Sequence, residues 1–212
     1  MNAMPTKVPP PPEDWVPKTK LGKLVVEGKI ASMLDVVLNG YVVQEPEIVK
    51  LLLPDLEYEV LEIRLVQKQT DAGERSRFRT VVVVGDRKGW IGLGTGKSRQ
   101  VHTAIEKGLS RALLEVVPVR RGCGSWECGC GTPHSLAVAT EGKRGSVRVR
   151  ILPGPKGLGL VAGETAKTIL ELAGIEDCWV VARGETRTVL SYAGAVYDAL
   201  KNTFKIQTRE VW

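Results

Sequence analysis

The sequence predicts an α+β protein with two folded units and a helical extension near its N-terminus. Residues 56–119 contain three strand patterns followed by a helix pattern, and residues 146–212 alternate strand and helix patterns. A chain of 212 residues with 43% apolar and 25% charged side chains has the length and composition of a protein with two folded cores. Its composition excludes wholesale disorder. A membrane protein is also excluded, because no apolar stretch approaches the roughly 18 to 20 residues of a spanning helix.

The first 20 residues have the composition of an extended segment. Four consecutive prolines follow Val8, and few apolar side chains are present. Such a segment cannot form a core, so we expect residues 1–20 to be an arm that orders only on a partner. The basic and apolar stretches of a signal peptide are missing at this end, which predicts a protein that stays inside the cell.

Residues 21–55 form the expected helical extension. Apolar residues at helical spacing predict one amphipathic helix over residues 24–38. A second, short helix is expected over residues 46–53, because Pro46 suits a first helical turn and Pro54 suits a stop.

The unit at residues 56–119 is expected to be a three-stranded sheet with a helix on one face. A basic loop over residues 68–79 separates the first two strands, and a turn with glycine at both ends, Gly85 to Gly89, separates the second and third. The expected strands cover residues 56–66, 80–84 and 90–94, and the expected helix covers residues 97–116.

Residues 120–145 are rich in glycine and hold three cysteines, which predicts an irregular loop. The unit that follows, residues 146–212, is expected to be α/β-like because its strand and helix patterns alternate. Its expected elements are a strand at 146–152, a helix at 165–172, a strand at 178–182, a helix at 189–203 and a tail at 205–212.

Positive charge is concentrated in the middle of the chain. Residues 64–111 hold 11 Lys and Arg against 4 Asp and Glu, and residues 120–150 hold 6 against 2. The first 63 residues have a net charge of −4, whereas the whole chain has +6. A local cationic excess suits a polyanionic partner, because phosphate neutralisation releases counterions. A solvated charged surface is the alternative.

The segment Gly92-Leu-Gly-Thr-Gly-Lys-Ser98 resembles a phosphate-binding loop but departs from the nucleotide-binding pattern. That pattern requires glycine five residues before the glycine of Gly-Lys-Ser, and Ile91 stands there. We therefore expect no bound nucleotide. A glycine-rich junction at a helix N-terminus would still hold a nucleic-acid phosphate beside Lys97 and Arg99. The alternative is that the glycines serve hairpin geometry only.

The loop contains Cys123, Cys128, Cys130 and His134, which together are a donor set for structural zinc. A glycine-rich segment with little core of its own would gain from such a cross-link. The spacing is not the usual Cys-x-x-Cys pair, and three free thiols with a polar histidine are the alternative. Catalytic zinc is not expected, because no general-base glutamate stands at a recognised spacing.

The remaining reactive side chains do not predict an active site. Cys178 lies in an apolar strand and is expected in the core, while His102 is expected on a surface. Neither histidine has the partners of a catalytic triad, so no catalytic residue is assigned. Arg120-Arg121 and Lys143-Arg144 flank the cysteine loop beside glycines, which favours contacts with a phosphate chain.

Motifs in both units resemble those of the fifth universal small-subunit ribosomal protein family, most closely its archaeal and eukaryotic form. The resemblance runs from about Leu21 to the C-terminus. It is carried by VQKQTDAGERSRF at 66–78, VVGDRKGWIGLG at 83–94, PVRRG at 118–122, GSVRVR at 145–150, PGPKGLGLV at 153–161 and LELAGIEDC at 170–178.

The resemblance implies a double-stranded-RNA-binding-like domain followed by a left-handed βαβ-type domain. It implies a place near the channel through which mRNA enters the small subunit, with contacts to rRNA and to the fourth, eighth and third universal small-subunit proteins. It also implies an effect on decoding accuracy. The cysteine cluster is not part of the general family pattern. The expected RNA-binding residues are Lys68, Arg75, Arg77, Arg79, Lys88, Lys97, Arg99, Arg120, Arg121, Lys143 and Arg144.

The sequence thus predicts a non-enzymatic, rRNA-binding constituent of the small ribosomal subunit, ribosome-bound in the cytoplasm. No membrane partner and no homo-oligomer are expected. Two alternatives stay open: a zinc-bearing RNA-binding factor outside the ribosome, and a nucleotide-hydrolysing enzyme that uses Lys97.

Overall fold

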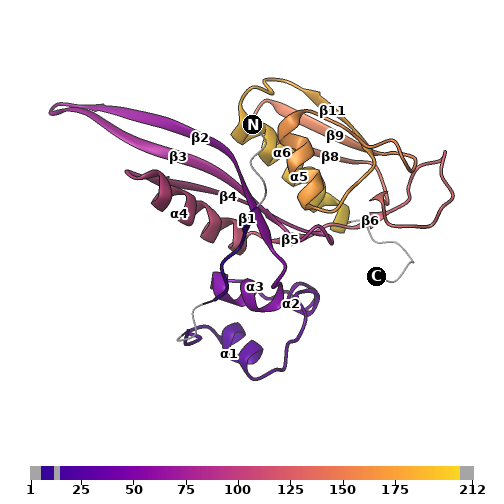
Figure 1. Cartoon of the computed structure of the whole chain (residues 1–212), viewed down its shortest axis with the longest axis horizontal. Helices are drawn as coiled ribbons and strands as arrows, with labels where there is room; N and C mark the ends of the chain where they lie inside the picture. The colour runs from indigo at the N-terminus through magenta and orange to yellow at the C-terminus, as the bar shows by residue number, and fades with distance from the viewer. Residues whose placement is uncertain (1–5, 12–14, 206–212) are drawn as a thin grey trace. The chain divides into compact units, whose positions relative to one another are not determined.

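The computed structural model describes residues 6–11 and 15–205, which fold into two compact units (Figure 1). The first unit takes the chain up to Val84 and then Gly92–Val116, and the second takes Gly85–Ile91 and the chain from Val117 onward. Both units combine sheet and helix, which confirms the predicted α+β class. No helix within the described residues is long and apolar enough to cross a membrane.

Three short helices form the N-terminal extension: α1 (Lys20–Val26), α2 (Met33–Leu38) and α3 (Pro46–Leu52). The expected single helix over residues 24–38 is wrong, because the chain breaks at Gly28, whose φ is +73°. Thr19 and Ser32 cap α1 and α2 by accepting hydrogen bonds from backbone N–H groups. The short helix at Pro46 is confirmed, apart from its last residue.

Residues 6–8 of the arm pair with the chain's own sheet. Strand β1 (Thr6–Lys7) pairs antiparallel with β2 (Glu57–Thr70), and Val8 donates a backbone hydrogen bond to Leu56 O at 2.9 Å. The expectation that the arm orders only on a partner is therefore wrong for these residues. The arm's residues 1–5 and 12–14 and the tail's residues 206–212 lie outside the described part of the chain.

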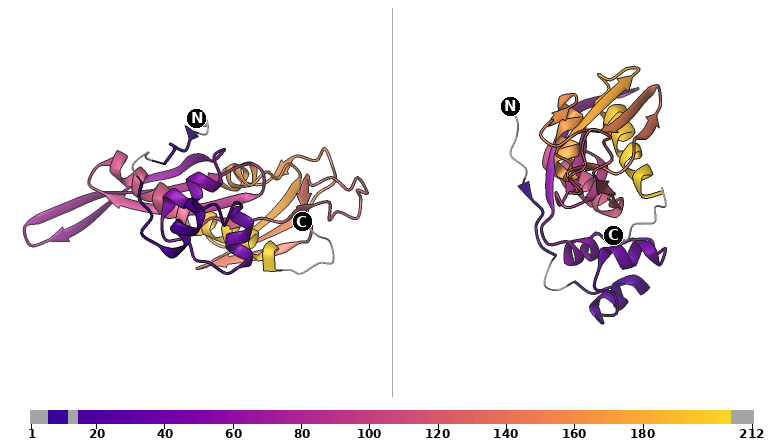
Figure 2. Two further views of the ribbon diagram at one scale, coloured as in Figure 1. Left: turned by 90° about the horizontal axis from the view of Figure 1, so that it is seen from below. Right: turned by 90° about the vertical axis from the view of Figure 1, so that its right-hand side faces the viewer.

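A five-stranded sheet has the order β1-β2-β3-β4-β5 (Figure 1). Figure 2 shows the long hairpin of its second and third strands from two further sides. Its further strands are β3 (Gly73–Gly85), β4 (Trp90–Ser98) and β5 (Val117–Pro118). The three expected strands are present, with the two-residue strands β1 and β5 added at the edges. The expected basic loop over residues 68–79 is wrong: apart from the turn at Asp71 and Ala72, those residues continue β2 and β3.

Helix α4 (Val101–Leu114) packs closely against β4 through glycine. A Cβ atom added at Gly92, Gly94 or Gly96 would overlap backbone atoms of α4 at Ala104, Gly108 or Ala112. These glycines lie within β4, and α4 begins only at Val101, so the expected phosphate-binding junction at a helix N-terminus is wrong. Their role is close approach of strand and helix, which also replaces the expectation of hairpin geometry.

The second unit is built on a four-stranded sheet of order β10-β11-β9-β8. Strands β8 and β11 both pair antiparallel with β9, and β10 pairs parallel with β11. Helices α5 and α6 contact each other, and α6 packs on β8 and β9. The elements are β8 (Thr140–Arg144), β9 (Val147–Pro153), β10 (Leu160–Val161), α5 (Glu164–Leu172), β11 (Cys178–Arg183) and α6 (Val189–Lys205).

The expected loop over residues 120–145 is more regular than predicted. Short strands β6 (Arg121–Gly122) and β7 (Ser135–Leu136) pair and enclose the cysteine segment, and β8 belongs to the main sheet. Burial alternates along β9, and Val147, Val149 and Ile151 point into the core. Cys178 is fully buried, as expected, and burial raises the pKa of its thiol to about 12.

Candidate nucleic-acid interface and metal centre

Strands β2 and β3 form a two-stranded ribbon with one polar and one cationic face. Gln67 Nε2 donates hydrogen bonds to Glu74 Oε2 at 3.1 Å and to Ser76 Oγ at 3.2 Å, so these three side chains share a face. Because successive residues of a strand alternate between faces, Arg75 and Arg77 belong to the other one. The ribbon therefore has Arg75 and Arg77 on the face opposite to Glu74.

The cationic face ends at Arg79, whose guanidinium group has one buried N–H without a partner. Lys68, Arg75 and Arg77 are exposed, whereas Arg79 is half-buried at the base of the ribbon. Arg79 Nε is buried and has no hydrogen-bond partner among the described residues. A buried N–H without a partner is costly, so Arg79 Nε carries a cost that no hydrogen bond of the described residues offsets.

Lys97 and Arg99 lie at the far end of the β3–β4 hairpin from its turn. Both side chains are exposed. In an antiparallel hairpin, residues at equal distances from the turn lie opposite each other. The end of β4 therefore lies beside the exposed half of β3. The structure thus brings Lys97 and Arg99 to the region of the sheet that carries the ribbon arginines.

The other predicted RNA-binding residues belong to the second unit: Lys88, Arg120, Arg121, Lys143 and Arg144. Arg121 donates from a guanidinium nitrogen to Gly174 O at 3.4 Å, so part of its hydrogen-bonding capacity serves the fold. Arg120 is half-buried and its backbone N–H is bound by Thr203 Oγ1 at 3.0 Å. Lys143 and Arg144 are exposed on β8.

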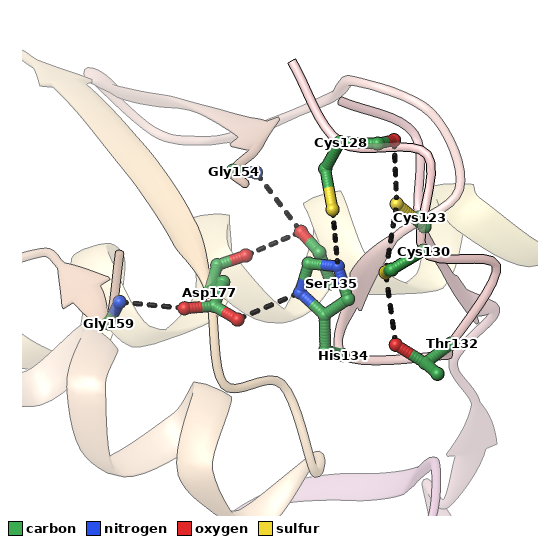
Figure 3. Close-up of polar contacts among 9 residues, drawn as sticks. All are labelled: Cys123, Cys128, Cys130, Thr132, His134, Ser135, Gly154, Gly159 and Asp177. Atoms are coloured by element: carbon green, nitrogen blue, oxygen red, sulfur yellow. Dashed lines mark hydrogen bonds and ion pairs between the residues drawn. The ribbon is translucent and has the colours of Figure 1, made fainter. Parts of the chain in front are cut away.

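Figure 3 shows the predicted metal ligands gathered around one point. The Sγ atoms of Cys123, Cys128 and Cys130 and the nearer ring nitrogen of His134 all lie within 4.8 Å of one another. Cys123 Sγ and Cys130 Sγ are 3.6 Å apart, and Cys128 Sγ is 3.9 Å from His134 Nε2. Tetrahedral zinc with Zn–S bonds near 2.3 Å separates its ligand atoms by roughly 3.8 Å.

A carboxylate behind the cluster orients the histidine. His134 Nδ1 lies 2.8 Å from Asp177 Oδ2, and both side chains are buried. Asp177 Oδ1 accepts a hydrogen bond from Gly159 N at 2.7 Å, while Ser135 Oγ donates to Asp177 O (Figure 3). With Nδ1 engaged, Nε2 faces the three sulfur atoms. Metal-binding histidines commonly have such a carboxylate partner.

Local hydrogen bonds favour the thiolate form of two cysteines. The Thr132 side chain lowers the pKa of Cys130 to about 6, and the backbone N–H of Lys156 lowers the pKa of Cys128. Burial beside neighbouring sulfurs raises the pKa of Cys123. Burial also disfavours a charged His134, but Cys128 and Asp177 outweigh it and raise its pKa.

The cluster fits a structural metal better than a catalytic one. Its three sulfur donors and one imidazole complete a tetrahedral set, so no position is left open for water or substrate. Borderline-soft zinc is the metal that prefers such ligands. Bound there, zinc would join β6, β7 and the segment between them.

Sequence reasoning missed Asp177, because nothing in the spacing connects it with a histidine 43 residues earlier. Thr132 beside Cys130 was also missed, although its place within the cysteine segment was a usable signal. His102 is exposed and lies 3.4 Å from Glu106 Oε1, which confirms its expected place on the surface.

Comparison with known proteins agrees with both units. Residues 56–120 match the family model for ribosomal protein S5, N-terminal domain, and residues 142–212 match the model for ribosomal protein S5, C-terminal domain. The chain belongs to the ribosomal protein S5 family. This membership confirms the resemblance to the fifth universal small-subunit protein.

Archaeal members of the S5 family are similar over nearly the whole chain. Small ribosomal subunit protein uS5 of Pyrobaculum islandicum is 55% identical over 190 residues, covering 90% of this chain and 94% of that protein. The proteins of the same name from Staphylothermus marinus and Saccharolobus solfataricus are 54% and 50% identical over 200 residues, with 94% of each chain covered.

Membership of this family settles the class of protein. The S5 family is one of structural ribosomal proteins, so the expectation of a non-enzymatic, ribosome-bound cytoplasmic protein is confirmed. The alternative of a nucleotide-hydrolysing enzyme is therefore wrong. The cysteine–histidine cluster is a feature of this chain that could hold a metal ion.

Proposed function

We propose that this structural constituent of the small ribosomal subunit binds rRNA through the cationic face of its β2–β3 ribbon. The single observation that supports this most is the segregation of charge on the ribbon, with Arg75 and Arg77 opposite the face of Gln67 and Glu74. Arginine matches phosphate geometry through its planar donors, so the contacts are expected to follow backbone and shape more than base identity.

Salt-dependent binding tests the proposal. Replacing Arg75, Arg77 and Arg79 with glutamine should weaken binding of the full chain to small-subunit rRNA. The slope of log binding constant against log salt concentration should become shallower by about 2 to 3. The matched control replaces three exposed lysines of the same unit, which removes the same charge: Lys20, Lys23 and Lys107. Equal loss in both triple variants would contradict a specific face.

The finer role follows from the family resemblance. The protein is proposed to lie near the channel through which mRNA enters, to contact the fourth, eighth and third universal small-subunit proteins, and to support decoding accuracy. Ribosomes that carry the ribbon variant should misread a near-cognate reporter codon at a changed frequency. An unchanged frequency in fully assembled subunits would argue against the link to accuracy.

The acidic extension supports contacts with basic proteins. The first 63 residues have a net charge of −4, and Val26, Leu38 and Val42 are exposed by 61%, 63% and 76%. Exposed apolar side chains beside acidic ones are expected to pack on a cationic protein neighbour. Cross-links from Val42 in assembled subunits should therefore reach protein, and cross-links to rRNA alone would contradict this.

A structural zinc ion is proposed at Cys123, Cys128, Cys130 and His134. The compact donor set and the Asp177 carboxylate behind His134 support it. Metal analysis of the purified full chain should find one zinc per chain, and Cys128→Ser should lose it. Cys178→Ala is the matched control, because the buried Cys178 thiol is not one of the clustered ligand atoms and its loss should leave the zinc content unchanged.

A further inference from the structure

The sheet of the second unit has one face covered by helices and one face left open. Val147, Val149 and Ile151 are buried on the side of α6, while Arg148 and Arg150 alternate with them and are exposed. Val181 on β11 is 46% exposed and is the register partner of Arg150, so it lies on the same open face. Among the described helices of the second unit, α6 is the one that packs on β8 and β9, and it lies on the other face.

Three cations stand side by side across the open face. Arg148 on β9 is the register partner of both Lys143 on β8 and Arg183 on β11. All three side chains are exposed, and none has a hydrogen bond or ion pair within residues 6–11 and 15–205. Like charges directly opposite each other destabilise a sheet. The row Lys143–Arg148–Arg183 therefore costs stability in the isolated protein.

The surroundings of the cationic row leave an excess of positive charge. Arg148 and Arg150 line a hollow of 630 Å³ together with Lys143, Arg183, Glu141 and Asp198. Arg150 Nε lies 3.3 Å from Glu141 Oε1, so that pair is neutralised locally. Outside that pair, the hollow has three cations against one carboxylate, Asp198.

We propose that the row Lys143–Arg148–Arg183 is a second rRNA-binding surface, which holds the phosphate backbone against the open face of the second unit. The inference rests on the proposed rRNA-binding function and adds a site that does not involve the β2–β3 ribbon. An acidic protein segment would have to present several carboxylates in register with the row. An RNA strand supplies a phosphate at every nucleotide, and arginine binds phosphate bidentately.

The first experiment measures binding of the full chain to small-subunit rRNA across a salt series. Replacing Lys143, Arg148 and Arg183 with glutamine should weaken binding at least tenfold. The slope of log binding constant against log salt concentration should become shallower by about 2 to 3. The matched control replaces Lys107, Lys167 and Lys201, which are exposed on helices and remove the same charge. A loss no greater than that of the control would overturn the proposal.

Thermal unfolding separates a binding role from a structural one. Because the row is a set of repelling charges, its glutamine variant should melt no lower than the unchanged protein. A lower melting temperature together with weaker binding would assign the row to the fold and overturn the inference. Failure of the unchanged protein to bind rRNA would instead contradict the proposed function, so the two failures are distinguishable.

Cross-linking in assembled small subunits identifies the occupant. A photoreactive residue at Val181, in the middle of the open face, should link to rRNA. A link to a ribosomal protein without any rRNA product would show that an acidic protein surface covers the row, and the proposal would be wrong.

Discussion

Two glycine-rich segments of this chain have similar compositions and opposite structural roles. In β4, Gly92, Gly94 and Gly96 lie in a regular strand against the backbone of α4. Between β6 and β7, a Cβ atom added at Gly129 would have no neighbouring atom within 4 Å, and Gly131 adopts a φ of +66°. The first segment is held by dense backbone packing, whereas the second has cysteines in place of a core.

The difference shows that glycine content alone does not distinguish a loop from a close contact. In β4 the glycines face small residues spaced four apart on a helix, Ala104, Gly108 and Ala112. In the cysteine segment the neighbours of glycine are metal-ligand types. Substitutions in the two segments should therefore differ sharply, and removal of metal should affect only one of them.

The largest effect is expected for Gly96→Ala. The new methyl group would overlap the backbone of α4 at Ala104 and Gly108, and neither strand nor helix can yield without losing packing. We expect a loss of about 3 kcal/mol or more in the free energy of unfolding, measured by denaturant titration. A loss below 1 kcal/mol would show that the contact is looser than described.

Removal of the proposed zinc ion is expected to have the next largest effect. Treatment with a strong chelator should lower the melting temperature of the second unit by about 10 °C, because binding free energy is folding free energy at a structural site. Hydrogen exchange should rise at β6 and β7 and stay unchanged in β4. Increased exchange in β4 to the same extent would break the contrast between the two segments.

A smaller effect is expected for Asp177→Asn. The amide cannot reproduce the charged partner of His134, so zinc affinity should fall by about 10- to 100-fold in a chelator competition. Glu176→Gln is the matched control, because Glu176 is exposed and its side chain lies outside the cluster. Similar zinc affinities for the two variants would show that Asp177 does not contribute to the metal site.

The smallest effect is expected for Gly129→Ala. Its added methyl group meets open space, so the free energy of unfolding should change by no more than about 0.5 kcal/mol. Gly131→Ala at the positive φ should cost about 1 kcal/mol, and the difference between the two variants measures backbone strain without packing. Equal changes would indicate that the segment rearranges.

Much of the fold could be predicted from the sequence, because β-branched runs and helical spacing mark most elements. The exposed half of the β2–β3 ribbon could not. Its residues 68–79 are polar except for Ala72 and Phe78, so no alternation of apolar residues marks them as strands. Backbone pairing extends the hairpin through them. The break at Gly28 was likewise hidden by apolar residues on both sides.

Prediction of the candidate sites reached the residues but not their arrangement. Cys123, Cys128, Cys130 and His134 lie close enough in sequence to be recognised together, whereas Asp177 arrives through the packing of a later strand. The row on the open face was visible only in part. The alternation of apolar and basic residues along β9 indicates that Arg148 points outward. Its cross-strand partners depend on register, which the sequence of one strand does not determine.

The turn between β3 and β4 has a consequence for how the chain can be divided. Residues 85–91 belong to the second unit, where Arg87 N donates to Leu172 O at 2.9 Å and Val119 N donates to Gly89 O. Residues 85–91 are synthesised before the rest of their unit. They therefore cannot make these hydrogen bonds until the C-terminal half of the chain has been synthesised. A gene fragment that starts at Val117 would omit it and leave Leu172 O and Val119 N without these partners.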